Sequence, residues 1–147
     1  MTAVDFSEKM LAKAKEKITS KKVRFVQADL LGVWDFTEGK YDLVTFSLIL
    51  EHIEDLGAIF KKVADSTSPN SYVYIGELHP FKQYSGSKAR FETMGRTQML
   101  TCFDHHVSDF FRAAFKHNFE PIVLNEHFDN RDRTTTPRIL TILLRKK

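Results

Sequence analysis

Hydrophobic and polar positions follow two different periods along this chain. The run from Asp42 to Ser47 is nearly continuous in apolar residues, which is typical of a strand that is buried on both faces. Polar Glu51 and His52 follow it, and apolar residues then recur at helical spacing from Leu56 to Ala64. Open α/β sheets bind ligands at the carboxyl ends of their strands. We therefore expect a functional site where this strand passes into this helix.

The same succession of strand and helix recurs through the chain and predicts an α/β fold. We expect strands at Val23–Asp29, Tyr41–Ser47, Ser71–Glu77, Phe119–Phe128 and Arg138–Arg145, and helices at about Ser7–Ile18, Leu56–Asp65 and Val107–His117. Asn70 is expected to take the left-handed backbone of a turn. Residues 81–104 lack a clear period and are interpreted as an insert that closes over the site, partly helical around Ser87–Phe91.

Composition limits the class of protein. A length of 147 residues suits one domain with a real core. The 22 basic and 19 acidic residues are spread along the chain, which argues against a specific nucleic-acid partner. No apolar run approaches the roughly 20 residues of a membrane span. The single cysteine, Cys102, excludes an internal disulfide and predicts a reducing, cytoplasmic location.

Two aspartates stand at the carboxyl ends of predicted strands. Asp5 lies between the apolar stub Ala3–Val4 and a helix, where it can accept hydrogen bonds from ribose hydroxyls or can cap the helix. Local chemistry does not favour either role. Asp29 can accept from an exocyclic amine while Leu30 packs on a base, or it can form a turn.

Several groups near the same predicted edge are candidates for a general base. They are His52, Glu77, His79, His105 and His106. Each histidine has a surface or capping role as its alternative. The histidine spacing gives no support to a metal site.

Three segments together carry a resemblance to a known family. They are Val4–Lys15, Phe25–Asp29, and Tyr41–Leu48 with Glu51 and His52. Their order and spacing resemble the class I S-adenosylmethionine-dependent methyltransferases. The resemblance implies a Rossmann-like sheet, mostly parallel with one antiparallel strand near the C-terminus, and helices on both faces.

The resemblance also implies S-adenosyl-L-methionine as cofactor and gives roles to several residues. Asp5 would hold the ribose, with Phe6 and Met10 nearby. Asp29 would meet the adenine amine, with Leu30 beside the ring. Phe46 and Ser47 would lie near the methionine moiety.

One departure from the family is large. No GxGxG motif occurs, and the resemblance begins at the end of the family's second strand. The first strand would then be missing from the middle of the sheet, through a partial gene, a clipped product or completion by a partner. We expect the chain alone to bind the cofactor poorly. We also expect unpaired edges near Val4 and Val44 to favour self-association.

Three function classes follow. The first is a methyltransferase, or a fragment of one, that acts on a small-molecule acceptor. The second is a non-catalytic methyltransferase-like subunit that pairs with a partner chain. The third is a nicotinamide-dependent enzyme, which would also need the Gly-rich loop that is missing here.

Overall fold

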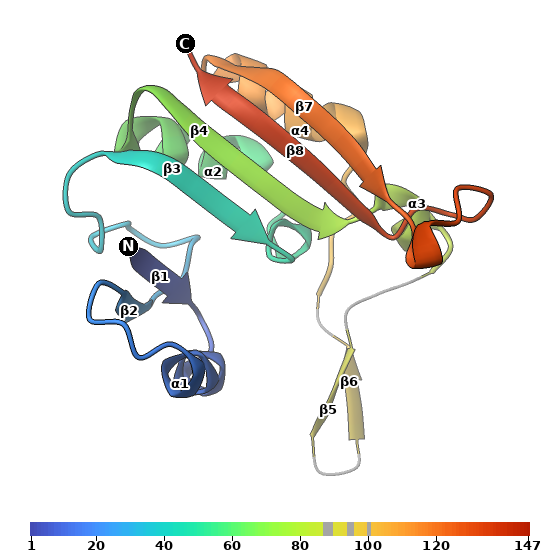
Figure 1. Ribbon diagram of the computed structural model, residues 1–147, viewed down its shortest axis with the longest axis horizontal. Helices are drawn as coiled ribbons and strands as arrows, with labels where there is room; N and C mark the ends of the chain where they lie inside the picture. The colour runs from blue at the N-terminus through green and yellow to red at the C-terminus, as the bar shows by residue number, and fades with distance from the viewer. Residues whose placement is uncertain (87–89, 94–95, 100) are drawn as a thin grey trace. The chain divides into compact units, whose positions relative to one another are not determined.

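The computed structural model describes residues 1–86, 90–93, 96–99 and 101–147 (Figure 1). The chain forms two compact units, residues 1–39 and residues 40–147, which are described separately below.

The first unit is a strand–helix–strand element. Strands β1 (Thr2–Asp5) and β2 (Arg24–Gln27) pair in parallel, and helix α1 (Glu8–Lys17) connects them. The helix begins as expected, because the Ser7 hydroxyl accepts a hydrogen bond from the Met10 backbone N–H at 3.3 Å. The helix predicted at Ser7–Ile18 and the strand predicted at Val23–Asp29 are thus confirmed. The apolar stub at Ala3–Val4 is part of β1.

The second unit is a four-stranded sheet in the order β3–β4–β8–β7. Strand β3 runs parallel to β4, and β8 runs antiparallel to both β4 and β7. The mostly parallel sheet with an antiparallel strand near the C-terminus is therefore confirmed. The strands are β3 (Tyr41–Ser47), β4 (Thr67–Leu78), β7 (Phe119–His127) and β8 (Ile139–Lys146).

Strand β4 begins four residues earlier than predicted, at Thr67 rather than Ser71. Asn70 lies within this extension with φ of 61°, the left-handed backbone that the sequence predicts. Strand β4 therefore begins to pair with β3 at Thr67, opposite Tyr41, and the chain bends afterwards at Asn70.

Helices α2 (Leu56–Ser66) and α4 (Val107–Lys116) cover one face of this sheet and contact each other (Figure 1). Beneath them lies a fully buried core. The side chains with 0% exposure are Leu50, Ile59, Val63, Val73, Ile75, Ala114, Leu140, Ile142 and Leu144. On β4 and β8 every second residue contributes, as expected of strands with one face on a core.

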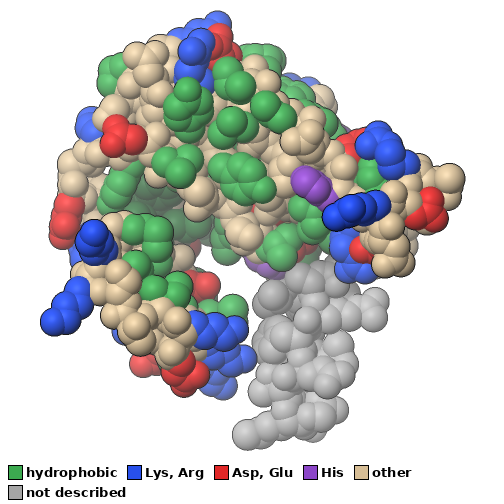
Figure 2. Space-filling view, in the orientation of Figure 1, with side chains coloured by type: hydrophobic (Ala, Val, Ile, Leu, Met, Phe, Trp, Pro, Cys, Tyr) green, Lys and Arg blue, Asp and Glu red, His purple; other side chains and the backbone are tan. Residues whose placement is uncertain are grey.

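The opposite face of the same sheet carries exposed apolar side chains. Leu43, Tyr72, Tyr74 and Val123 are 55%, 41%, 40% and 42% exposed. Figure 2 shows hydrophobic side chains gathered over this face. Helices were expected on both faces of the sheet; in the described part of the second unit, α2 and α4 lie on the same one.

Short elements complete the described chain. They are a 3₁₀ turn (Leu50–His52), helix α3 (Pro80–Tyr84), a hairpin of β5 (Arg90–Thr93) and β6 (Arg96–Met99), and a 3₁₀ turn (Asp129–Arg131). Of the segment predicted as partly helical, residues 87–89 lie outside the described residues, and Arg90 and Phe91 belong to a strand. Among the described residues, no helix has the length and apolar character needed to cross a membrane.

The contact between Phe60 of α2 and Phe119 of β7 tests this packing. Both rings are 1% exposed and meet edge to face with centroids 6.0 Å apart. We expect Phe60→Ala to lower the free energy of unfolding by about 3–5 kcal/mol, because the substitution leaves a cavity in the core. Urea denaturation measures the change. Phe115→Ala on α4 is the matched control, because its ring is 58% exposed and should alter stability by only about 0.5 kcal/mol.

Candidate active site at the strand ends

The carboxyl tip of β3 is held by a side chain from the neighbouring strand. The Oε1 atom of Glu77 on β4 accepts hydrogen bonds from the backbone N–H groups of Ile49 and Leu50, both at 3.1 Å. Leu48, directly after β3, has φ of 52°, a conformation that is uncommon for a residue with a branched side chain. Its own N–H donates to the Gly76 carbonyl at 2.9 Å. The turn after Ser47 is therefore fixed by β4.

Two carboxyl groups are buried at this turn. Glu77 is 1% exposed and Glu51 is 6% exposed, and the Oε2 atom of each has no hydrogen-bond partner among the described residues. Burial raises the pKa of Glu77 above its ordinary value, and the nearby charge of Glu51 raises it further. Hydrogen bonds from Leu50 and Ile49 oppose this rise in pKa. Glu77 is thus positioned by the backbone in an environment that disfavours its charged form.

His52 is oriented by a backbone carbonyl. Its Nδ1 lies 2.9 Å from the carbonyl oxygen of Thr101, which only accepts, so Nδ1 carries the proton. In the neutral ring Nε2 then holds a lone pair. Nε2 lies 3.9 Å from Glu51 Oε1, and the His52 side chain is 24% exposed. A partly exposed imidazole with a defined tautomer is suited to accept a proton.

His79 has a structural role. The ring is 1% exposed. Its Nδ1 accepts from the Phe81 backbone N–H at 3.2 Å, and its Nε2–H donates to Glu126 Oε1 at 3.1 Å. Since both ring nitrogens are engaged, His79 begins helix α3 and joins it to β7.

The adjacent pair His105 and His106 splits between buried and exposed positions. His105 is 7% exposed, and its Nε2–H donates to the Ile53 carbonyl at 2.7 Å. His106 is exposed, and its Nδ1 is hydrogen-bonded to the Tyr84 hydroxyl. Of the two, only His106 presents its ring to solvent.

The predicted adenosine contacts lie at the carboxyl edge of the first unit. Asp5 Oδ1 accepts from the Ser7 N–H at 2.7 Å, and Asp29 Oδ1 accepts from the Leu31 N–H at 2.8 Å. Each aspartate thus stabilises the local turn, as its structural alternative requires. Both of these hydrogen bonds engage Oδ1, and the role of each aspartate as acceptor for a ligand hydroxyl or amine stays a prediction.

Apolar residues stand close to these two aspartates in the sequence. Phe6 and Met10 are 71% and 53% exposed, and Leu30 is half-buried. Exposed apolar groups beside hydrogen-bond acceptors fit a nucleoside, which has a flat base and polar hydroxyls. The residues present therefore fit the adenosine half of the cofactor.

The two residues predicted near the methionine moiety differ in exposure. Phe46 is 4% exposed, and its ring belongs to the core beneath the helices. Ser47, at the end of β3, is exposed. Ser47 can offer its side chain to a ligand, whereas Phe46 contributes to the rigidity of the strand. Among the described residues, no group of three or more His, Cys, Asp or Glu side chains could hold a metal ion.

Three partners of the histidines could not be foreseen from the sequence. They are Thr101, Tyr84 and Glu126, which lie 22 to 49 residues from the histidines they contact. Glu51 differs, because it precedes His52 directly at the predicted strand end.

The buried carboxyl of Glu77 predicts a specific pH dependence of stability. A pKa that is higher in the folded than in the unfolded chain means that ionisation destabilises the fold, increasingly as pH rises from about 4.5 through the folded pKa. Glu77→Gln removes this titration and keeps an acceptor for Ile49 and Leu50. Its free energy of unfolding relative to the wild type should therefore rise with pH over this window, as measured by urea denaturation.

Glu120 provides the control for this measurement. Its pKa is lowered by the hydrogen bond from Arg145, so Glu120→Gln should show the opposite slope, with its relative stability falling as pH rises. A pH-independent difference between Glu77→Gln and the wild type would contradict the assignment.

Comparison with known proteins agrees with this arrangement. The family model described as methyltransferase domain matches residues 1–75. No curated protein sequence gives a significant match.

Structures of S-adenosylmethionine-dependent methyltransferases from Listeria monocytogenes and Mesorhizobium loti each align with 99% of this chain and 79% of their own length. Their TM-scores are both 0.79, at 21% and 20% identity. The N-methyltransferase NodS of Bradyrhizobium japonicum aligns with 99% of this chain and 72% of its own, with a TM-score of 0.70 and 11% identity. NodS is also known in complex with S-adenosyl-l-homocysteine. These neighbours confirm the expected fold. The chain therefore belongs to the methyltransferase-domain family and has the fold of the class I S-adenosylmethionine-dependent methyltransferases.

Proposed function

We propose that this domain transfers a methyl group from S-adenosyl-L-methionine to a small-molecule acceptor, with His52 as general base. The observation that carries the proposal is the tautomer of His52. Thr101 holds the proton on Nδ1 and leaves a partly exposed Nε2 lone pair five residues after the end of β3. Of the other candidates for the base, Glu77 and His79 are 1% exposed and His105 is 7% exposed. His106 is exposed, but its Nδ1 bonds to the Tyr84 hydroxyl, which can donate or accept and so does not define the tautomer.

Asp5 and Asp29 are proposed to bind the adenosine part of the cofactor. Asp5 would accept from ribose hydroxyls through the oxygen that Ser7 leaves unused. Asp29 would accept from the adenine amine. Phe6, Met10 and Leu30 would contact the apolar faces of the nucleoside. Ser47 would meet the methionine part.

The chemistry needs little from the protein beyond position and proton removal. When bound, the cofactor supplies an electrophilic methyl group on a sulfonium. Glu77 holds the turn after Ser47, so that the backbone at the strand tip keeps one geometry. His52 Nε2 takes the proton that an acceptor hydroxyl or amine loses as its bond to the methyl carbon forms. Glu51, with Oε1 3.9 Å away, stabilises the imidazolium that results.

A second candidate is a non-catalytic methyltransferase-like subunit that self-associates or pairs with a partner chain. Two features of the described second unit favour it. Strand β3 pairs only with β4, and Leu43, Tyr72 and Tyr74 are exposed on one sheet face. An open strand edge beside apolar surface is a place where a further strand can add. Either candidate suits the cytoplasm, where a single cysteine outside any disulfide stays reduced.

The proposed role of Asp5 in cofactor binding can be tested separately from its hydrogen bond with Ser7 at the start of α1. Asp5→Asn keeps an oxygen for the Ser7 N–H and removes the charge. We expect the dissociation constant for S-adenosylhomocysteine, measured calorimetrically, to rise roughly ten- to a hundred-fold, because hydrogen bonds to a charged acceptor are lost. Asp29→Asn should have a smaller effect. Unchanged affinity in Asp5→Asn would mean that Asp5 only stabilises the local turn.

The role of His52 is tested by methyl transfer itself. Radiolabelled S-adenosylmethionine is offered with a panel of small hydroxyl and amine acceptors at several pH values. We expect His52→Gln to lower kcat by about 10²–10⁴ for an acceptor that must lose a proton, and to leave S-adenosylhomocysteine affinity unchanged. The pH dependence that the imidazole contributes to kcat should also disappear.

His127→Gln is the control for this experiment. His127 is exposed on β7, where its Nε2 contacts the Thr141 hydroxyl at 3.0 Å. The His127→Gln variant should retain full methyl-transfer activity. Transfer at wild-type rate by His52→Gln would exclude His52 as the base. Absence of any transfer by the wild type, together with a stable dimer in light scattering, would favour the non-catalytic subunit.

A further inference from the structure

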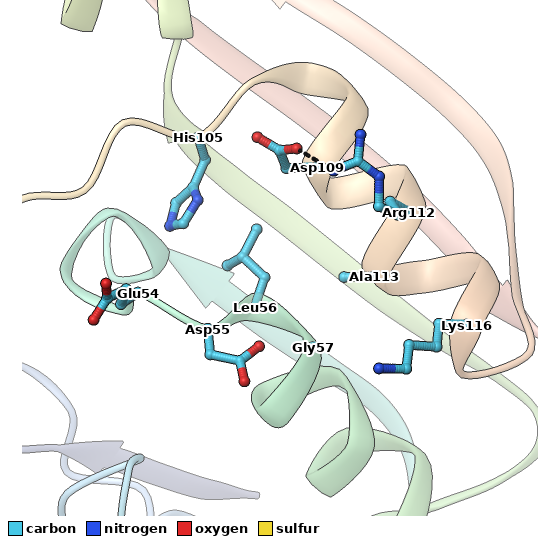
Figure 3. A pocket seen from close by; sticks show the side chains of 9 residues that line it. All are labelled: Glu54, Asp55, Leu56, Gly57, His105, Asp109, Arg112, Ala113 and Lys116. Atoms are coloured by element: carbon cyan, nitrogen blue, oxygen red, sulfur yellow. Dashed lines mark hydrogen bonds and ion pairs between the residues drawn. The ribbon is translucent and has the colours of Figure 1, made fainter.

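A groove of about 340 Å³ lies in the second unit between the start of α2 and helix α4 (Figure 3). Leu56 and Ala113 give it an apolar lining, and both are almost completely buried, at 5% and 7% exposure. The residues proposed above for the cofactor and for proton transfer do not line it. The groove is therefore a second concave surface with its own chemistry.

Opposite charges face each other across this groove. The side chains of Asp55 and Lys116 point toward one another in Figure 3, yet they form no ion pair. Asp55 Oδ1 accepts from the Ala58 N–H at 3.1 Å and leaves its other oxygen toward the groove. By contrast, Asp109 and Arg112 pair with each other at 3.1 Å, so their charges are already compensated. In the described part of the chain, Lys116 has no anionic partner.

An acceptor nitrogen also faces the groove. The Nε2–H of His105 donates to the Ile53 carbonyl, so in the neutral ring Nδ1 is an acceptor, and no described residue donates to it. In Figure 3 this second nitrogen lies on the side of Leu56. His105 is 7% exposed and lines the groove, so its ring has a fixed place in the wall. A ligand N–H that enters the groove can donate to this nitrogen.

We propose that this groove binds a small zwitterion of the amino-acid type, with its ammonium group against Asp55 and His105 and its carboxylate against Lys116. A simple anion would meet the charge of Asp55, and a simple cation would meet that of Lys116. A molecule with both charges satisfies both walls, and its methylene groups lie on Leu56 and Ala113. This binding depends on none of the residues proposed for methyl transfer.

The test is an NMR titration of the whole chain with glycine, β-alanine and 4-aminobutyrate, whose two charges are increasingly far apart. Methylammonium chloride and sodium acetate serve as single-charge probes. We expect at least one zwitterion to saturate the shifts of backbone amides in residues 54–57 and 113–116, with a dissociation constant in about the millimolar range for so small a ligand. The single-charge probes should not saturate at the same concentrations.

Two variants remove one charge each and keep the fold. Asp55→Asn retains a cap for α2, because asparagine also accepts from the Ala58 N–H. Lys116→Met retains the aliphatic part of an exposed side chain. Each should weaken binding about tenfold. Lys61→Met is the matched control, since Lys61 pairs with Asp65 outside the groove and its loss should change nothing.

Three results would overturn the proposal. They are the absence of saturation by any of the three zwitterions, equal binding of the single-charge probes, and unchanged affinity in both charge variants. Circular dichroism of each variant establishes that it is folded before affinities are compared. Methyl transfer is measured separately, so loss of one activity does not imply loss of the other.

Discussion

The site in the second unit depends on one buried carboxylate. Glu77 comes from β4, and its oxygen accepts from two successive backbone N–H groups at the tip of β3. These groups begin a 3₁₀ turn and would otherwise be buried without an acceptor, at a cost of about 1–3 kcal/mol each. The same turn contains the left-handed Leu48 and leads directly to Glu51 and His52. The position of His52 is therefore set by a residue 25 positions later in the sequence.

The buried Glu77 carboxylate fixes the geometry of the turn but lowers the free energy of unfolding when it is charged. Burial raises the pKa of Glu77, and the neighbouring Glu51 adds an unfavourable like charge. An amide in the same place could accept the same hydrogen bonds without this penalty. Buried ionisable groups with shifted pKa values concentrate at functional sites, where geometry and charge matter more than stability. The raised pKa of the buried Glu77 thus supports the proposal that this turn belongs to an active site, independently of the family resemblance.

The fold was predictable because its signals are local. Apolar periodicity locates α1, α2 and α4 to within two residues, and the caps at Ser7 and Asp55 are short-range hydrogen bonds. Helix α3 has no such periodicity and was not predicted. Asn70 tolerates a left-handed backbone through its own side chain. The site was predictable only in its position at the strand ends. Which ring nitrogen of each histidine is available depends on Thr101, Glu126 and Tyr84, which are distant in sequence and reach the histidines through the tertiary fold.

The histidines show why proximity to a strand end is a weak criterion for catalysis. His52 and His79 both follow sheet strands closely, and sequence alone ranks them equally. His79 has no exposed surface to offer and uses both nitrogens to connect α3 and β7. His52 has its Nδ1 on a carbonyl that cannot donate, and this contact defines a basic nitrogen at Nε2, 3.9 Å from Glu51 Oε1. A base needs one orienting contact and one vacant lone pair within reach of solvent. Among the candidate histidines, His52 is the one that combines a tautomer defined by an acceptor-only partner with a partly exposed side chain.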